Sequence, residues 1–541
     1  MTYFASIRLP FKLTQTRLIP VVTCFIMSLH NFAFFKNFFE TYSDSEKFYQ
    51  QALSVAIFHS CLLILLFSLF GVGRFLKFSL AIILIISSMA AYFIDSYNVV
   101  IDANMIENLL ETDTNEIRDL LSTKLYLYLI FLGVIPAYVL ARLELAEERL
   151  KFVLLKRIAL MVISLLIALG TLYVSSDFFA SYFREHKILR YYSNPTTPIY
   201  SSIRFGMDKL KTSTPLELSK IGTDALIPKL DKENELIVLV VGETARSDHF
   251  SLNGYKRKTN PLLEKENLIS FINVSSCGTS TATSVPCMFS FLTHEEYDSD
   301  QAATTENILD ILKRAGIQVL WRDNNSSSKG VADRVEYQNF KTPDLNTICN
   351  PECRDEGMLI GLNEWITQYP NRDILIVLHQ MGSHGPAYYK RYPDRFYQFK
   401  NACQSVQLED CSQQEIVNAY DNTILYTDYF LSKVINWLKQ QSFQYEVSML
   451  YFSDHGESLG EKGLYLHGFP YALAPEAQKN IPAIIWSAEN NNDIDMESVR
   501  KKIIQPISHD NLVHTLMGMF EIDSNIYRRQ DDILEYLHQY H

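Results

Sequence analysis

The fold of the C-terminal part of this 541-residue chain is decided by two stretches, Leu236–Glu243 (LIVLVVGE) and Val447–Glu457 (VSMLYFSDHGE). Each is a short apolar run, typical of a buried strand, that ends in small and acidic residues. Open α/β sheets bind their ligands beyond the carboxyl ends of the strands. The acids that follow these two runs are therefore candidate ligand-binding residues.

Further runs of the same kind surround these stretches and alternate with helical patterns. Strands are expected at 236–241, 317–321, 374–379, 447–453 and 481–486, and helices at 305–315, 415–440 and 510–520. This alternation predicts an α/β domain, with helices packed on the faces of one sheet.

The first third of the chain is different, because long apolar runs stand there almost free of charge. The runs are Leu18–Phe39, Leu53–Val72, Phe75–Ile94, Leu125–Leu143 and Ile158–Val174. A helix needs roughly 20 residues to cross a bilayer, and about 17 are tolerated. One cleaved signal peptide cannot explain five runs, and buried core helices rarely follow one another in such number. The sequence therefore predicts an α-helical membrane domain of about five transmembrane helices.

Loop charge predicts the orientation of these helices. One set of loops is rich in basic residues: Arg8, Lys12, Arg17, Arg74, Lys77, Arg142, Arg149, Lys151, Lys156 and Arg157. The opposite loops hold little beyond Lys47 and Arg118. The N-terminus is therefore expected in the cytoplasm, and everything after about Val174 on the far side. The net charge of −12 argues against a nucleic-acid-binding protein, which needs a basic face.

Cysteine placement points to the same compartment. Two cysteines lie in the apolar runs, and the other six lie in the exported part, in neighbouring pairs. An even number suits an oxidising compartment, although six cysteines allow many connectivities. Pairing of nearest neighbours is the expectation: Cys277–Cys287, Cys349–Cys353 and Cys403–Cys411. A thiolate zinc site is disfavoured, because no Cys-x-x-Cys spacing occurs.

We expect three regions: a transmembrane domain over 1–176, a bridging segment over 177–232 and a catalytic α/β domain over 233–541. Between the third and fourth spans, the segment 98–123 has polar and apolar residues at helical spacing. That pattern suits an amphipathic helix on the membrane surface, or alternatively a plain connecting loop. Its candidate lipid-contacting residues are Asn104, Asn108 and Glu111.

Three strand-end segments carry candidate chemistry. Glu243 follows a strand and a glycine, although such an acid can also simply stabilise a helix N-terminus. Asp454 and His455 supply the oxygen and nitrogen ligands that Zn²⁺ accepts, and His467 follows twelve residues after His455. The third segment is the hydroxyl-rich loop Cys277–Cys287, CGTSTATSVPC. A metal or base beside it would activate a hydroxyl as a nucleophile, but spacing alone does not select which one.

Several motifs together resemble one family. Gly242–Arg246 (GETAR), Cys277–Ala282 (CGTSTA), Gly382–Pro386 (GSHGP) and Ser453–Gly460 (SDHGESLG) are similar to motifs of the lipid A phosphoethanolamine transferases. That family includes the mobile colistin-resistance enzymes and has an alkaline-phosphatase-like catalytic fold. The resemblance covers essentially the whole chain, with five spans and three local cysteine pairs.

The resemblance implies roles for individual residues. It implies a zinc site formed by Glu243, Thr281, Asp454 and His455, with Thr281 as the nucleophile that becomes loaded with phosphoethanolamine. It also implies phosphate-binding or proton-transferring roles for four residues: Asn325, Lys329, His384 and His467. Five other histidines are expected to be ordinary core or surface residues: His249, His294, His379, His509 and His514.

The function that follows is transfer of phosphoethanolamine from phosphatidylethanolamine to a lipid A phosphate. The expected setting is the bacterial inner membrane, with a monomeric enzyme whose catalytic domain is periplasmic. The product would carry fewer exposed acidic phosphates, so polymyxin resistance is expected. Alternatives are another acceptor (an inner-core sugar or periplasmic glucan), a sulfatase- or phosphatase-like hydrolase, a glycerol-phosphate polymerase, and a non-catalytic scaffold. A sulfatase needs a Cys-x-Pro-x-Arg setting, which the Cys287 region lacks.

Overall fold

The computed structural model describes residues 12–111, 118, 120–211, 218–228, 233–350, 352–491 and 493–537. The chain forms two compact units. The first comprises Met1–Ile106 and Leu121–Asp208, and the second Glu107–Leu120 and Lys209–His541. The boundaries at 176 and 232 that we draw from the sequence stay a prediction.

The first unit is helical, and four of its helical segments are long and apolar enough to cross a membrane. They are α3 (Phe48–Ser68), α4 (Arg74–Tyr97), α7–η1–α8 (Thr123–Tyr128, Leu129–Val134 and Ile135–Arg142) and α9 (Leu150–Val174). Each has 20 to 25 residues. At about 1.5 Å per residue, that length matches the hydrocarbon core of a bilayer.

The prediction of one continuous first span was wrong. The run forms two helices, α1 (Gln15–Leu29) and α2 (Phe32–Tyr42), which are bent by 60°. Two polar residues, His30 and Asn31, lie between the helices and explain the break, because the side-chain amide of Asn31 donates to the backbone oxygen of Ile26. The total of five spans holds only if this bent pair counts as one.

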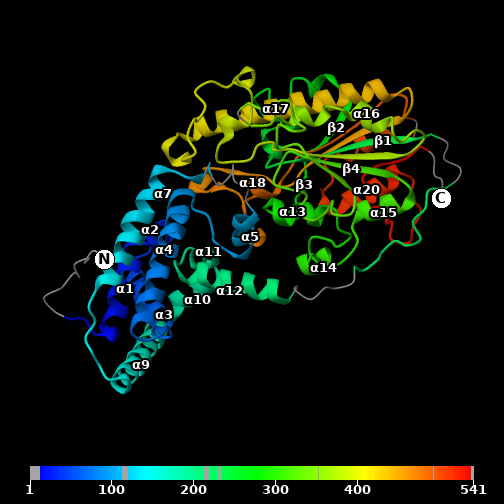
Figure 1. Ribbon diagram of the computed structural model, residues 1–541. Coiled ribbons are helices and arrows are strands. Elements are labelled where there is room, and N and C mark those ends of the chain that lie inside the picture. The colour runs from blue at the N-terminus through cyan, green and yellow to red at the C-terminus, as the bar shows by residue number, and fades with distance from the viewer. Residues whose placement is uncertain are drawn as a thin grey trace. The chain divides into compact units, whose positions relative to one another are not determined.

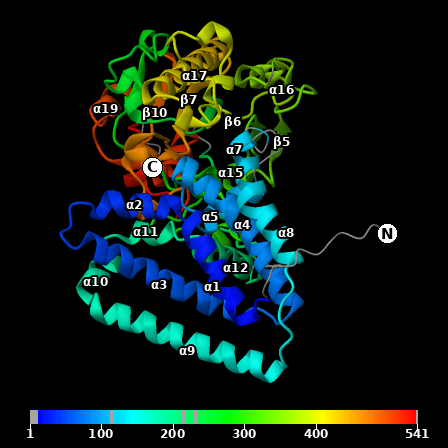
Figure 2. The ribbon, with the colours of Figure 1, turned by 90° about the vertical axis from the view of Figure 1, so that its left-hand side faces the viewer.

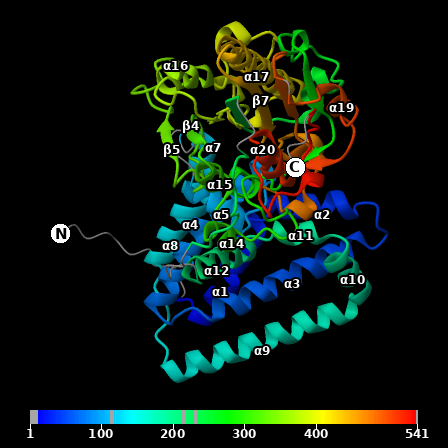
Figure 3. The ribbon, with the colours of Figure 1, turned by 90° about the vertical axis from the view of Figure 1, so that its right-hand side faces the viewer.

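The last long helix, α9, begins at Leu150 rather than at Ile158. Arg157 allows this extension through a basic stretch, because its guanidinium donates to the backbone oxygen of Phe70 at 2.6 Å. Helices α3 and α9 lie side by side in both turned views (Figures 2 and 3).

The segment after α4 contains helix α5 (Ala103–Glu111), as the amphipathic pattern predicts. Its side chains at Asn104 and Glu111 lie outside the described residues. The bridging segment is partly helical, with α10 (Ser176–Arg184), α11 (Lys187–Tyr191) and α12 (Thr196–Lys211).

The second unit is built on a seven-stranded sheet with the order β2-β10-β7-β1-β6-β4-β5 (Figure 1). Its strands are β1 (Glu235–Gly242), β2 (Leu268–Phe271), β4 (Gln318–Asp323), β5 (Glu336–Asn339), β6 (Ile374–His379), β7 (Glu446–Ser453) and β10 (Ala483–Ser487). The five strands from β7 to β5 are parallel, and β10 runs antiparallel to both of its neighbours. The sequence pattern missed β2 and β5, since both have only four residues.

Strand β1 is the centre of the sheet, and all eight of its residues are buried. Alternate side chains enter two separate cores, as the two-residue period of a strand requires. Val238 and Val240 pack with α17 (Gln413–Gln441) on one face, and Leu239 packs with α15 (Ile308–Ala315) and α20 (Leu512–Met519) on the other. Burial on both faces explains why the run is continuously apolar.

Candidate active site

The carboxyl ends of β1 and β7 bring the sequence-predicted acids together. The register pairs Gly242 with Ser453, and the backbone N–H of Asp454 donates to the oxygen of Gly242 at 2.9 Å. Glu243 and Asp454 therefore follow adjacent parallel strands at one edge of the sheet. Both side chains are fully enclosed, as is His455.

Thr281 approaches this group from a different segment. It is the first residue of α13 (Thr281–Met288), after the N-cap Ser280. Its Oγ1 donates to Glu243 Oε2 at 3.0 Å and lies 3.4 Å from His455 Nε2. The hydroxyl thus stands at a helix N-terminus, where backbone N–H groups and the helix dipole favour an anion.

The geometry of the three ligand candidates fits a divalent cation. One ligand atom from each of Glu243, Asp454 and His455 lies within 4.8 Å of the others. Within the described part of the chain, Glu243 Oε1 and Asp454 Oδ2 are buried without a hydrogen-bond partner. Buried carboxylate oxygens are costly unless a cation compensates them. The set of two oxygens and one imidazole nitrogen matches a catalytic zinc site with a position left for the substrate.

The protonation states agree with metal ligation. His455 donates Nδ1–H to the oxygen of Gly456 at 2.9 Å, which leaves the Nε2 lone pair facing the two acids. Burial lowers the pKa of His455 to about 4, so its imidazole is neutral at neutral pH. Burial and the neighbouring Asp454 raise the pKa of Glu243 well above its usual range. A cation between the two carboxylates would remove that repulsion.

The hydroxyl-rich loop from Cys277 to Cys287 is fixed at both ends. Cys277 and Cys287 form a disulfide across it. Gly278 donates its N–H to Ser284 Oγ at 2.9 Å, and the oxygen of Thr279 accepts from Gly468 N–H at 2.7 Å. The other two disulfides also join sequence neighbours, Cys349–Cys353 and Cys403–Cys411.

Asn325 lies within the same centre. Its Nδ2 donates at 2.7 Å both to Glu243 Oε2 and to the backbone oxygen of Gln380. Lys329 belongs to the same loop after β4 and is half-buried, with a left-handed φ of 51°. The amide of Asn325 therefore orients the Glu243 carboxylate.

Two further histidines border the centre. The ring of His467 lies 4.4 Å from that of His455 and 5.5 Å from that of His384. Glu457, which the sequence analysis left without a role, contacts His467 Nδ1 at 3.4 Å. Desolvation and the neighbouring His467 lower the pKa of His384 well below its usual value.

Asn108 of α5 also lies on this side of the second unit. Its Nδ2 is 3.8 Å from the point where a Cβ on Gly468 would stand, one residue beyond His467. The side chains of Asn104 and Glu111 lie outside the described residues.

One histidine that we expected to be ordinary supports the site. His509 accepts from the N–H of Cys277 and donates Nε2–H to the oxygen of Ser453, which ties the start of the hydroxyl-rich loop to the end of β7. No local pattern marks this residue in the sequence. His379 pairs with Asp323 inside the sheet, as a core histidine would.

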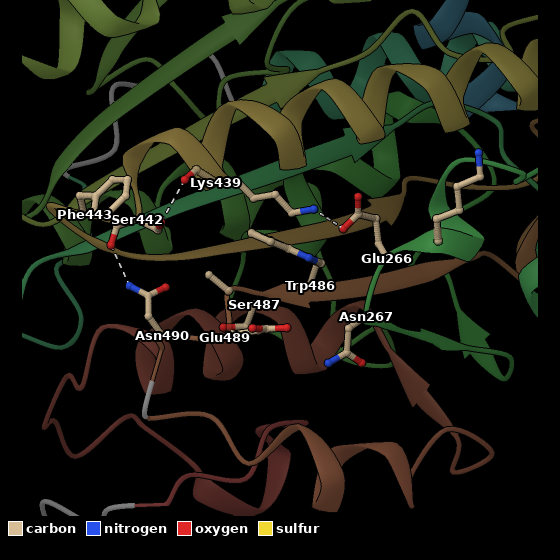
Figure 4. A pocket seen from close by; sticks show the side chains of 11 residues that line it. Glu266, Asn267, Lys439, Ser442, Phe443, Trp486, Ser487, Glu489 and Asn490 are labelled. Carbon is tan, nitrogen blue, oxygen red and sulfur yellow. Dashed lines mark hydrogen bonds and ion pairs between the residues drawn. The ribbon is translucent and has the colours of Figure 1, made fainter.

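A pocket of about 560 Å³ lies at the other edge of the sheet (Figure 4). Lys439 Nζ and Glu266 Oε2 form an ion pair across it at 2.6 Å, and Asn490 donates to the oxygen of Ser442. Among its described lining residues there is no histidine, threonine or cysteine. The pocket therefore lacks the residue types of the centre at Glu243.

Comparison with known proteins agrees with this centre. Residues 59–210 match the family model "Phosphoethanolamine transferase EptA/EptB", and residues 235–522 match the sulfatase model. Phosphatidylethanolamine transferase Mcr-1 of Escherichia coli is 41% identical over 522 residues, which cover 94% of this chain and 95% of the relative.

Solved structures show the same architecture. The integral membrane protein lipooligosaccharide phosphoethanolamine transferase A of Neisseria meningitidis superposes with a TM-score of 0.90 at 31% identity, covering 97% of this chain and 99% of that one. The C-terminal periplasmic domain of phosphoethanolamine transferase EptC from Campylobacter jejuni is 43% identical, with a TM-score of 0.53, and covers 58% of this chain and 97% of its own. The fold is thus a helical membrane domain followed by a sulfatase-like α/β domain. This chain belongs to the phosphoethanolamine transferase family and is a phosphoethanolamine transferase.

Proposed function

We propose that the enzyme transfers phosphoethanolamine from phosphatidylethanolamine to a lipid A phosphate through a phosphorylated Thr281. The observation that carries this proposal is the position of Thr281 Oγ1, 3.0 Å from Glu243 Oε2 and at the N-terminus of α13. The names of relatives support the substrates, since they include phosphatidylethanolamine transferases and Kdo(2)-lipid A phosphoethanolamine transferases.

Thr281, Glu243, Asp454 and His455 would hold a zinc ion. When bound, zinc lowers the pKa of an adjacent hydroxyl and neutralises charge on a phosphoryl oxygen. Glu243 Oε2 already accepts a hydrogen bond from the Thr281 hydroxyl, so the lone pairs of that hydroxyl oxygen face away from the carboxylate. The backbone N–H groups at the start of α13 are suited to the phosphate of the donor.

In the first half-reaction, Thr281 Oγ1 gives its proton to Glu243 Oε2, its hydrogen-bond acceptor, and forms a bond to phosphorus, while the bond from phosphorus to the diacylglycerol oxygen breaks. Diacylglycerol leaves with a proton, for which His467 is the proposed donor and His384 its neighbour. Glu457 beside Nδ1 stabilises the charged form of His467. Acid catalysis of this kind contributes typically about 10²–10⁴-fold. Lys329 and Asn325 are proposed to contact the phosphate oxygens.

In the second half-reaction, a lipid A phosphate oxygen bonds to the same phosphorus, the bond from phosphorus to Thr281 Oγ1 breaks, and Thr281 takes its proton back from Glu243 Oε2. The product carries an ammonium group over a formerly acidic phosphate. We therefore expect weaker attraction of cationic polymyxins to cells that carry it.

Both proposed substrates are lipids, which supports an enzyme anchored in the inner membrane with its α/β domain in the periplasm, and we propose that it acts as a monomer. The apolar helices and the basic loops on one side agree with that placement. Asn104, Asn108 and Glu111 on α5 are proposed to bind the donor lipid at the membrane surface. The position of Asn108 beside Gly468 supports this for one of the three residues.

The test compares Thr281→Ala with Thr283→Ala, a hydroxyl on the same helix that lies off the acid cluster. Each full-length protein is expressed in a bacterium without its own transferase, and lipid A is analysed by mass spectrometry. We expect one added phosphoethanolamine with the native enzyme and with Thr283→Ala, and none with Thr281→Ala.

An acid-quenched reaction should also yield a phosphoethanolamine-bearing peptide that contains Thr281. Full lipid A modification by Thr281→Ala would refute the covalent mechanism. Modification of an inner-core sugar or a glucan, with unmodified lipid A, would refute the acceptor and leave the mechanism standing.

A further inference from the structure

Asp355 has no part in the chemistry above, yet its carboxylate is enclosed at 2% exposure. Its two oxygens accept four hydrogen bonds. Asn324 Nδ2 and Met381 N–H reach Oδ1 at 2.7 and 2.8 Å, and Gln380 Nε2 and Gly382 N–H reach Oδ2 at 3.2 and 3.3 Å. All four donors are neutral amides, so hydrogen bonds rather than a cation offset the burial of this charge.

The four donors belong to the two loops that hold Glu243. Asn324 precedes Asn325, whose amide binds Glu243 Oε2 at 2.7 Å. Gly382 precedes Ser383, whose N–H donates to the backbone oxygen of Glu243 at 3.0 Å. A Cβ on Gly382 would lie 2.8 Å from that same oxygen, so this loop is pressed against Glu243.

We propose that Asp355 is a positioning residue, which locks the loops after β4 and β6 together so that Asn325 and His384 face the reacting phosphoryl group. This inference rests on the roles that the proposed function gives to Asn325 and His384. Asp355 itself touches neither Glu243 nor Thr281 in any recorded hydrogen bond of the described residues. It acts through the loops that it holds.

The segment around Asp355 is itself well anchored, which a positioning residue needs. Arg354 donates to the backbone oxygen of Lys390 at 2.7 Å. Glu352 pairs with Arg391 at 2.6 Å, and the Nε of Arg391 donates to the backbone oxygen of His384 at 2.8 Å. The segment from Glu352 to Asp355 therefore contacts the loop that holds His384 in two ways. Glu352 does so through Arg391, and Asp355 does so through the N–H groups of Met381 and Gly382.

A carboxylate is required because it offers about four acceptor sites, one for each donor. In Asp355→Asn, one oxygen becomes an NH₂ group that faces N–H donors instead of accepting from them. The shape of the side chain is kept, so the variant tests the hydrogen bonds rather than the volume. Glu356→Gln is the matched control, since the neighbouring Glu356 pairs with Arg395 in an outer ion pair.

The experiment uses the full-length protein in detergent and measures headgroup release from a short-chain phosphatidylethanolamine, per folded molecule. For Asp355→Asn we expect kcat to fall about 10–100-fold, as for losses of groups that orient active-site ligands. We expect KM to change less than about threefold, because the contacts of Asn325 and His384 with the phosphoryl group are expected to matter mainly in the transition state. Glu356→Gln should stay within about twofold. A kcat of Asp355→Asn within about threefold of the native value would overturn the proposal.

A second variant covers a failure of Asp355→Asn to fold. Asn324→Ala removes one donor and keeps the carboxylate, and its kcat should fall about three- to tenfold with KM unchanged. No loss in this folded variant would overturn the proposal. In this assay water takes the phosphoethanolamine from Thr281 in place of lipid A, so the comparison stands even if lipid A is not the acceptor. If the native protein releases no headgroup, the proposed function fails instead.

Discussion

Two acidic groups lie at opposite ends of the same two strands, and only one of them has the composition of an active site. Glu235 and Glu446 begin β1 and β7 and are register partners, with Asp493 beside them. Glu243 and Asp454 follow the same strands at the other end. In each group, three ligand atoms lie within 4.8 Å of one another.

The two groups differ in the residues and helix ends that lie beside the acids. At the carboxyl edge, His455 adds a nitrogen ligand, Thr281 adds a hydroxyl, and α13 begins beside them. At the amino edge, the third member is the half-buried Asp493, and the preceding helix α17 ends there rather than begins. Helix C-termini carry partial negative charge and disfavour phosphate. In this protein, the acidic group suited to a phosphoryl group is the one where strand ends and a helix start coincide.

Metal removal should give the largest effect. Dialysis of the full-length protein against a chelator is expected to reduce headgroup release more than about 10³-fold, because the charge on the phosphoryl group is no longer neutralised. Added Zn²⁺ should restore the rate, and metal analysis should follow the activity. Full activity of the metal-free protein would show that the acidic group at the carboxyl edge of the sheet is no more a metal site than the group at the amino edge.

Glu243→Gln is expected to come next, with a loss of about 10²–10³-fold in kcat, because a ligand and the Thr281 hydrogen-bond acceptor are weakened. Glu235→Gln, at the other end of the same strand, is the matched control. The measurements are the initial rate and the metal content of each variant. Equal losses in the two variants would show that the edges are not distinct.

Asn325→Ala should have a smaller effect, since it removes an orienting group rather than a ligand. We expect a decrease of about 10–100-fold in kcat. Zinc should still bind, but with a lower affinity. The neighbouring Ser326→Ala should react at the native rate. A native rate in Asn325→Ala would mean that Glu243 is held without this amide.

Glu446→Gln is expected to have the smallest effect, with activity within about twofold of the native value. Glu446 is the first residue of β7 and Asp454 directly follows the strand, so eight residue steps separate them, roughly 26 Å at about 3.3 Å per residue. Metal analysis should find no ion lost in this variant. Loss of both metal and activity would assign a role to the amino edge.

Part of the site could be predicted because it is local in sequence. Asp454 and His455 directly follow an apolar run, and β6 and β7 were predicted within one residue of their observed bounds. Strands buried on both faces leave a continuous apolar signal. Polar residues directly after such a signal fall at the carboxyl edge of the sheet.

The hydroxyl that faces Glu243 could not be identified from the local sequence. Residue spacing left the loop from Cys277 to Cys287 open, and only the family resemblance pointed to Thr281. In the structure, Thr279 donates to the oxygen of Phe469 and Ser284 accepts from Gly278, while Thr281 alone of these three donates to Glu243. Side-chain direction at a helix start depends on where the helix packs, which spacing does not contain.

By itself, the sequence determined the apolar spans, the sheet's central strands and the residues that follow them, because burial imposes a period that can be counted. Only the tertiary structure decided the bend between α1 and α2, the contact of His509 with Cys277, and the four donors that converge on Asp355. These features join segments far apart in the chain. Their energy comes from matching donors to acceptors in space, and no pattern of neighbouring residues records that match.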